Sequence, residues 1–286
     1  MAITVGSNVA SLQAQRRLAD SSGRLSKTFE RLSSGQRINR ASDDAAGLAI
    51  ADSLKADMRV ASIAIRNAND GISTIAIADS ALNQIGEVLT RLAELSEQSA
   101  NGTFSSTQRS ALANEFVALG SEIERIAVTT VFNGVRLLSG NSSLTLQVGF
   151  SSASTSQLTY TGVQGTLASL GLAAANNSSL QFSITGTDIP GGQSSSRAAL
   201  DAIYGAIGSL ASTRGTLGSI ESRLQVTINS LATARENFAA AESRIRDVDV
   251  AGEAAELTRL NILQQAGASV LAQANQQPAL ALSLLG

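Results

Sequence analysis

Two short acidic motifs, Ser42-Asp43-Asp44 and Asp247-Val248-Asp249, hold the residues of this chain best suited to chemistry. Closely spaced carboxylates can share a proton, as a general acid and base do, or bind a divalent cation. The chain lacks the groups that usually complete such sites. Its 286 residues include no His, the commonest general base and transition-metal ligand, and no Cys to supply a thiolate. We therefore expect no catalytic residue, no metal site and no cofactor.

The same carboxylates suit the ends of helices. Ser42 has the side chain of an N-cap residue, and Asp43 and Asp44 would follow it in a first helical turn, where negative charge is favourable. Ion pairs are the second structural use that we expect, with Arg37, Arg40, Arg244 or Arg246 as partners. Helix capping and ion pairing are thus the predicted roles of both motifs.

Charge and hydropathy exclude two further classes of protein. The net charge of −2 does not favour a nucleic-acid binder, although residues 1–40 carry seven basic side chains against Asp20 and Glu30. The opening MAITVGSNVASLQAQRR lacks the continuous apolar region of a cleavable signal peptide. Asn, Gln and Pro278 interrupt the apolar C-terminal segment, so we expect no membrane insertion.

Long helices are the elements that must position these residues. Apolar residues recur at helical spacing from Val5 to about Leu32, and a loop at 33–44 follows. A second helical pattern runs from Ala45 to about Ala100 and ends at Asn101-Gly102. A third spans about 106–128 and ends before a turn at Asn133-Gly134. From Arg197 the helical pattern returns and continues nearly to the end of the chain.

The central residues 139–196 have a different composition, rich in Ser, Thr, Gly and Asn. Alternation of apolar and polar residues predicts strands at 144–150 and at 180–184. Helical patterns therefore enclose a small β-rich insert. The predicted fold class is mainly α, with the two ends of the chain folded into a long antiparallel helical bundle or coiled coil.

The last 27 residues, after Arg259, contain no charged side chain. Their apolar positions Leu260, Leu263 and Val270 repeat at three to four and at seven residues, and the first helix offers Leu18, Leu25 and Leu32 at a spacing of seven. Two helices cannot bury every face of such a segment. We therefore expect other copies of the chain to cover the rest, which makes self-assembly the first functional inference.

Both ends of the chain resemble bacterial flagellin. The motifs that carry the resemblance are LSSGQRINRASDDAAGLAIADSL (32–54), NDGISTIAIADSALNQIGEVLTRLAELSEQSANGT (69–103), FNGVRLL (132–138), ESRIRDVDVAGEAAELTRLNILQQAGASVLAQANQQP (242–278) and LSLL (282–285). Together they cover roughly residues 1–140 and 200–286. The middle of the chain matches no family motif, as expected of a short form with a reduced variable region.

The resemblance implies a structural subunit that self-assembles into the extracellular flagellar filament. It implies export in unfolded form by the flagellar type III system, and an export chaperone, the filament cap and the hook-junction proteins as partners. The implied domains are an inner coiled-coil assembly domain (1–42 and 245–286), a helical rod domain (43–139 and 197–244) and the variable insert (140–196). The alternative that we weigh is a hook–filament junction protein, which shares the plan of terminal helices.

The resemblance also implies functional positions. Leu18, Leu25, Leu32, Leu260, Leu263 and Val270 would form the assembly core, together with the C-terminal Leu282, Leu284 and Leu285. Arg91, Leu95 and Glu115 match the patch that the vertebrate Toll-like receptor for flagellin contacts. Their alternative role is ordinary helix packing, with the leucine in the core and the charged side chains in solvent.

Overall fold

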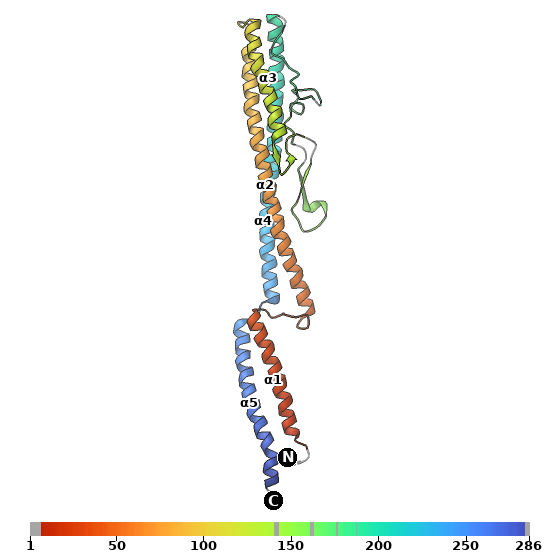
Figure 1. The fold of residues 1–286 in the computed structure, drawn as a ribbon, viewed down its shortest axis with the longest axis vertical. Coiled ribbons are helices and arrows are strands. Elements are labelled where there is room, and N and C mark those ends of the chain that lie inside the picture. The colour runs from red at the N-terminus through yellow and green to blue at the C-terminus, as the bar shows by residue number, and fades with distance from the viewer. Residues whose placement is uncertain (1–6, 140–142, 161–162, 176, 187, 284–286) are drawn as a thin grey trace. The chain divides into compact units, whose positions relative to one another are not determined.

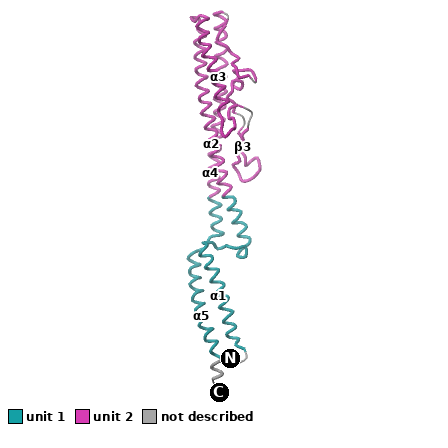
Figure 2. The backbone as a smooth tube through the Cα atoms, in the orientation of Figure 1, with its two compact units in different colours: residues 1–58, 236–286 teal, residues 59–235 magenta. Residues whose placement is uncertain are grey.

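The computed structural model describes residues 7–139, 143–160, 163–175, 177–186 and 188–283, with side chains described up to residue 277. The chain divides into two compact units, shown in Figure 2. Unit 1 comprises residues 1–58 and 236–286, and unit 2 comprises residues 59–235. No helix among the described residues is long and apolar enough to cross a membrane.

Unit 1 is built on an antiparallel pair of helices, α1 (Val9–Ser34) and α5 (Val250–Ser283), which lie side by side in Figure 1. At one end of the pair, Asn8 Nδ2 donates to the carbonyl oxygen of Ala274 at 2.8 Å. At the other end, Arg31 lies 3.8 Å from Glu253. These contacts join the start of one helix to the end of the other, so the predicted antiparallel pairing of the N-terminal and C-terminal helices is confirmed.

The N-terminal and C-terminal parts of unit 1 each contain a short non-helical segment, and these two segments pair with each other. Helix α1 ends at Ser34 and is capped by Gly35, whose φ of 70° suits glycine, and α4 (Ile189–Arg246) ends two residues before Val248. The Val248 N–H donates to the carbonyl oxygen of Gly35 at 3.1 Å, and Gln36 and Asp247 form an antiparallel bridge. The unbroken C-terminal helix expected from the sequence is therefore wrong at residues 247–249, where backbone pairing between the two arms replaces helical hydrogen bonds.

Two aspartates restart the helices after this break. Asp44 Oδ1 accepts the N–H of Gly47 at 2.9 Å at the start of α2 (Ala45–Ala100). Asp249 Oδ1 accepts the N–H groups of Ala251 and Gly252 at 3.1 and 3.2 Å at the start of α5. Capping by the acidic motifs is confirmed. The predicted N-cap Ser42 is wrong, because α2 begins three residues later and Asp44 takes that position.

Unit 2 packs α2, α3 (Ser106–Thr129) and α4 around one apolar core. A capping box between Ser105 and Gln108 starts α3. After α3 a short hairpin pairs β1 (Val131–Phe132) with β2 (Val135–Arg136), and positive φ angles at Asn133 and Gly134 form the predicted turn. The largest fully buried side chains of the helices are Leu82, Ile85, Leu89, Leu92, Leu95, Arg109, Phe116 and Ile123.

The central insert lies on these helices as a second antiparallel hairpin with irregular connections (Figure 1). β3 (Leu144–Gln147) pairs with β4 (Gln157–Tyr160), and the 3-10 turn η1 (Ser154–Ser156) precedes β4. Leu158 and Tyr160 are buried, and a methyl group added at Gly71 of α2 would collide with Leu146. The predicted fold class, mainly α with a small β-rich insert, is confirmed.

Two sequence expectations for the insert are wrong. Residues 180–184 alternate in burial as predicted but form no strand, because the carbonyl oxygen of Ile184 accepts from the hydroxyls of Ser99 and Ser196 in place of a neighbouring strand. Helix α4 begins at Ile189, eight residues before the predicted start. Asp188 caps it by accepting the N–H of Gly191 at 2.8 Å, and Pro190 suits its first turn.

Candidate assembly interface

The contact surface between α1 and α5, called the seam here, is formed by residues that recur along each helix at alternating spacings of three and four. Leu18, Leu25 and Leu32 of α1 are half-buried against α5. On α5, Leu260 is only 2% exposed. A Cβ atom added at Gly267 would lie 3.3 Å from Leu18 Cδ1, so this glycine lets the two helices approach closely. The seam thus accounts for four of the six residues assigned to the assembly core.

The other two residues lie on a second apolar face of α5 that the described residues of unit 1 leave exposed. Leu263 is 46% exposed, Val270 is 59% exposed, and Ile262 is 61% exposed. Helix α1 also presents large apolar side chains to water, namely Val9, Leu12 and Phe29. Contiguous exposed apolar side chains of this kind mark interaction sites. Helix α5 therefore has one face buried within the chain and one face open for another partner.

The C-terminal leucines complete the sequence-based list. Leu282 belongs to α5, but its side chain lies outside the described part of the chain. Leu284 and Leu285 lie outside the described residues. The burial of these three positions therefore remains a prediction.

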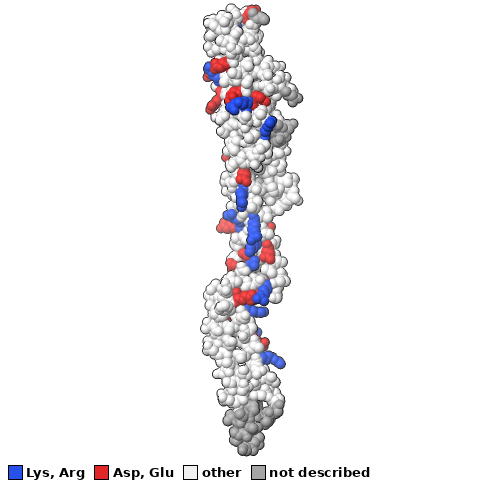
Figure 3. All heavy atoms as spheres, in the orientation of Figure 1, with Lys and Arg blue, Asp and Glu red and all other residues white. Residues whose placement is uncertain are grey.

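The open face of α5 carries no charge. The last ion pair along α5 joins Arg259 to Glu256, and this hydrogen bond lowers the pKa of the Glu256 carboxyl. Figure 3 shows a viewer-facing surface over α1 and α5 that is mostly neither acidic nor basic, in contrast to the charged side chains gathered farther along the chain. An uncharged surface can be buried by another protein without the cost of desolvating a charge.

The acidic motifs have structural roles. Asp43 Oδ2 accepts the N–H groups of Arg40 and Asn39 at 3.1 and 3.2 Å, and these two hydrogen bonds lower the pKa of its carboxyl. The predicted ion pairs are wrong: Arg40 pairs with Glu30 at 2.9 Å and Arg246 with Asp52 at 3.3 Å. The described residues contain no group of three or more His, Cys, Asp or Glu side chains that could hold a metal ion.

In unit 2 the structure brings together two of the three residues of the predicted receptor-sensed patch. Arg91 Nε donates to Glu115 Oε1 at 2.9 Å, and a second guanidinium nitrogen of Arg91 lies 2.8 Å from Glu94. The hydrogen bonds to Glu94 and Glu115 raise the pKa of Arg91. Leu95 is fully buried in the core, next to Leu92. The exposed part of the predicted patch therefore consists of the ion pairs of Arg91, and Leu95 lies beneath the surface.

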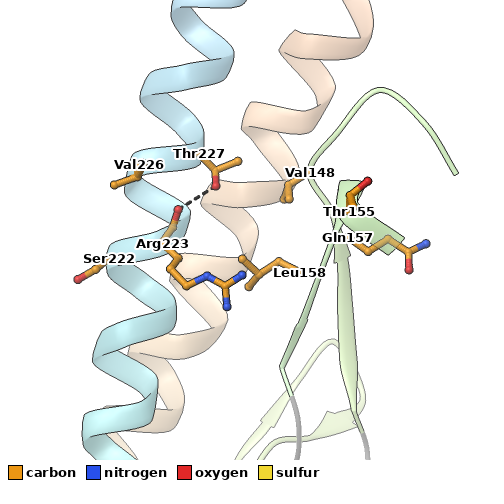
Figure 4. A pocket seen from close by; sticks show the side chains of 8 residues that line it. All are labelled: Val148, Thr155, Gln157, Leu158, Ser222, Arg223, Val226 and Thr227. Atoms are coloured by element: carbon orange, nitrogen blue, oxygen red, sulfur yellow. Dashed lines mark hydrogen bonds between the residues drawn. The ribbon is translucent and has the colours of Figure 1, made fainter. Parts of the chain in front are cut away.

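A groove of about 410 Å³ separates the β3–β4 hairpin from α4 in unit 2 (Figure 4). Val148 and Leu158 line it from the hairpin side, and Arg223 and Val226 line it from α4. Thr227 Oγ1 donates to the carbonyl oxygen of Arg223 at 2.8 Å. Arg223 is the only charged residue among the described residues that line the groove, and none of these residues is a carboxylate that could act with it as an acid–base pair.

Comparison with known proteins shows which family the two terminal helical regions match. Residues 5–143 match the model of the bacterial flagellin N-terminal helical region, and residues 200–285 match that of the C-terminal helical region. The flagellin of Halalkalibacterium halodurans is 42% identical over 98% of this chain and 99% of its own length. The flagellin of Bacillus subtilis and the flagellar filament 33 kDa core protein of Treponema phagedenis are each 38% identical, at the same coverage.

Among solved structures, the crystal structure of Bacillus cereus flagellin is 28% identical, with a TM-score of 0.47 over 62% of this chain and 94% of the other. The relatives reported above are flagellins and a filament core protein, and they give no support to a hook–filament junction protein. The matches to both terminal regions, and to whole flagellins of similar length, lead to one conclusion: the chain belongs to the bacterial flagellin family, whose members are structural subunits of the extracellular flagellar filament.

Proposed function

We propose that this chain assembles into the flagellar filament through unit 1, with other copies covering the open face of α5. The observation that carries the proposal is the difference between two faces of one helix. Leu260 is buried against α1, whereas Ile262, Leu263 and Val270 remain largely in water. A helix that is apolar on more than one face is stable when it is buried on more than one side.

Covering this face contributes a favourable free energy to polymerisation. Full burial of a Val, Leu or Ile side chain stabilises by about 1.5–3 kcal/mol, so each half-exposed side chain would contribute about 1 kcal/mol or more. The same contribution recurs in every copy. We propose that a different surface of the next copy covers this face, so that the contact is heterologous and can propagate as a helix.

The proposed domains follow from the same assignment. Residues 1–42 and 245–286 form the assembly domain, residues 43–139 and 197–244 the helical rod domain, and residues 140–196 the variable insert. The support for the first boundary is the paired break between α1 and α2 and between α4 and α5. We assign no catalytic activity to any of these parts, and we include the C-terminal Leu282, Leu284 and Leu285 in the assembly domain.

Family membership supports further partners. We propose export in unfolded form by the flagellar type III system, with an export chaperone, the filament cap and the hook-junction proteins as partners. We also propose that the Toll-like receptor for flagellin senses the patch at Arg91 and Glu115. Both side chains are exposed and paired with each other, whereas Leu95 would act from the core by supporting the helix surface above it.

Charge substitution on the open face tests the proposal. Val270→Asp or Leu263→Asp would bury an unpaired carboxylate in every copy of the polymer, at a cost of about 3–5 kcal/mol per subunit. In the single chain both side chains are exposed, so the circular dichroism of the monomer should not change. We expect sedimentable filaments to disappear with either substitution and to persist with the size control Val270→Ile. Normal filaments from both aspartate variants would contradict the proposal.

A further inference from the structure

The β3–β4 hairpin of unit 2 has backbone groups that point away from both of its strands. In an antiparallel pair, every second pair of facing residues exchanges hydrogen bonds, and the residues between them direct their N–H and C=O groups outward. The Val148 N–H donates to the carbonyl oxygen of Ser156 at 2.9 Å, which sets the phase of this alternation. Thr145 and Thr159 face each other three positions farther along, so each directs its backbone groups to an outer edge of the hairpin.

The two outer edges differ in what they bind. On β3, the carbonyl oxygen of Gln147 accepts from Asn67 Nδ2 of α2 at 2.9 Å, so this edge lies against α2. On β4, the Gln157 N–H donates to the carbonyl oxygen of Ser154 in the preceding turn. The carbonyl oxygen of Gln157 and both backbone groups of Thr159 make no hydrogen bond within the described residues, and both residues are exposed. β4 therefore presents an open edge on which another strand can pair.

The groove of about 410 Å³ between the hairpin and α4 lies beside this strand (Figure 4). Gln157 and Leu158 line it from β4, and the Arg223 side chain extends from α4 towards Leu158. Val226 of α4 is 68% exposed, and Arg223 makes no ion pair within the described residues. Neighbouring strands lie about 4.8 Å apart, so a strand paired with β4 would lie over this groove.

The lining of the groove indicates which peptide would fit. Val226 and Leu158 would pack on an apolar side chain, and Arg223 would form a charge-assisted hydrogen bond with a carboxylate. Arg223 and Val226 are about 4.5 Å apart along the axis of α4. Alternate residues of a strand point to the same face and are about 6.6 Å apart, which is close to that spacing. The matching segment therefore carries an apolar and an acidic residue two positions apart.

We propose that the open edge of β4 and the adjoining groove bind an extended acidic segment of another protein, which pairs with β4 as a third strand. Hydrogen bonds to the backbone of Gln157 and Thr159 hold the segment, and Arg223 selects an acidic side chain. The inference is independent of the proposed function, because this surface belongs to unit 2 and the open face of α5 belongs to unit 1.

The test measures binding of a dye-labelled peptide, TVTETV, to the monomeric full chain by fluorescence anisotropy. Thr159→Pro removes the free N–H of β4, and Thr145→Pro is its matched control, because it removes the corresponding outward N–H at the other edge. Arg223→Gln removes the cation of the groove, and Arg197→Gln removes an exposed cation of α4 outside it. The peptide TVTQTV, which lacks the carboxylate, completes the set.

We expect Thr159→Pro and Arg223→Gln each to weaken binding of TVTETV at least about tenfold, and the two controls to change it less than about twofold. The unsubstituted chain should bind TVTQTV about as weakly as Arg223→Gln binds TVTETV. Circular dichroism verifies that the two proline variants remain folded, and Arg223→Gln changes an exposed side chain only.

Three results would overturn the proposal. Equal affinity of Thr159→Pro and Thr145→Pro would show that no strand pairs with β4. Equal affinity of the two peptides for the unsubstituted chain, or no binding up to about 1 mM, would show that the groove does not select an acidic segment. Loss of filaments in Val226→Asp would show that a second copy of this chain occupies the groove.

Discussion

Arg37 and Arg246 join the two arms of the chain through their backbones. The N–H of Arg37 donates to the carbonyl oxygen of Arg246 at 2.6 Å, and the guanidinium of Arg37 donates to the carbonyl oxygen of Ile245 at 2.7 Å. The Arg246 side chain, 14% exposed, donates in turn to Gln36 Oε1 at 3.0 Å. These contacts hold the end of α1 close to the start of α5, where the pairing of the two helices begins.

The first prediction concerns this link. Arg246→Ala removes the hydrogen bonds to Gln36 and Asp52 from a largely buried position, which costs about 1–3 kcal/mol locally. The paired non-helical segments around residues 35–40 and 247–249 should separate more often. Trypsin should therefore cleave after Arg37 and Arg40 about tenfold faster, as mapped by mass spectrometry. Arg244→Ala serves as the control, because Arg244 is exposed and has no ion pair among the described residues. Equal cleavage of both variants would contradict a structural role for Arg246.

The second prediction concerns Asp79 and Arg214, the ion pair between α2 and α4 in unit 2. Arg214 Nε lies 2.7 Å from Asp79 Oδ1, and this hydrogen bond lowers the pKa of the Asp79 carboxyl below its usual 3.8. A lowered carboxyl pKa in the folded state contributes stability that is complete above the unfolded value and is lost as the pH falls through the folded value. Both side chains are well exposed, so the contribution is at most about 1 kcal/mol.

The measurement is urea unfolding of Arg214→Met and of the unsubstituted chain at pH 7 and at a pH near 2. We expect the variant to be less stable at pH 7 and the difference to shrink as the pH falls towards and through the lowered folded-state pKa of Asp79. A difference that stays constant between the two pH values would mean that Arg214 acts through packing alone.

The third prediction concerns glycines of unit 2. Gly71 faces Leu146 of β3 so closely that a methyl group would displace it, whereas Gly215 of α4 faces open space. Gly71→Ala should destabilise by about 1–3 kcal/mol, because the Leu146 side chain must leave its packed position against α2. Gly215→Ala should stabilise by up to about 1 kcal/mol, because alanine is the better helix former and meets nothing. Thermal unfolding followed by circular dichroism compares them, and a stabilised Gly71→Ala would show that the hairpin is not seated on α2.

The sequence predicted the architecture well where local signals decide it. The spacing of seven between Leu18, Leu25 and Leu32 marks the seam of α1, and Asn133-Gly134 marks a tight hairpin turn, since both depend on residues close in the chain. The missed break at 247–249 depends on pairing with Gly35 and Gln36, more than 200 residues away. One signal for it was present: Asp249 precedes a helical turn that contains Glu253, as an N-cap residue would.

The site was only partly predictable for the same reason. Periodicity shows that Leu260, Leu263 and Val270 belong to an apolar helix, but it cannot show that Leu260 alone faces α1. Likewise, Arg91 and Leu95 are one turn apart on α2, yet the core of unit 2 buries the leucine and leaves the arginine in water. Which side of a helix is buried depends on the elements that pack against it, and a local sequence pattern does not specify those elements.

The most direct test of the account measures whether the open face of α5 is covered in the polymer. The chain contains no Cys, so Val270→Cys introduces a single thiol on that face, and Ser152→Cys introduces one at an exposed position of the insert as the control. Maleimide labelling rates are compared between monomer and filament. We expect Cys at position 270 to react at least about tenfold more slowly in the filament, with the control nearly unchanged. Equal rates at position 270 in both states would contradict burial of this face by other copies.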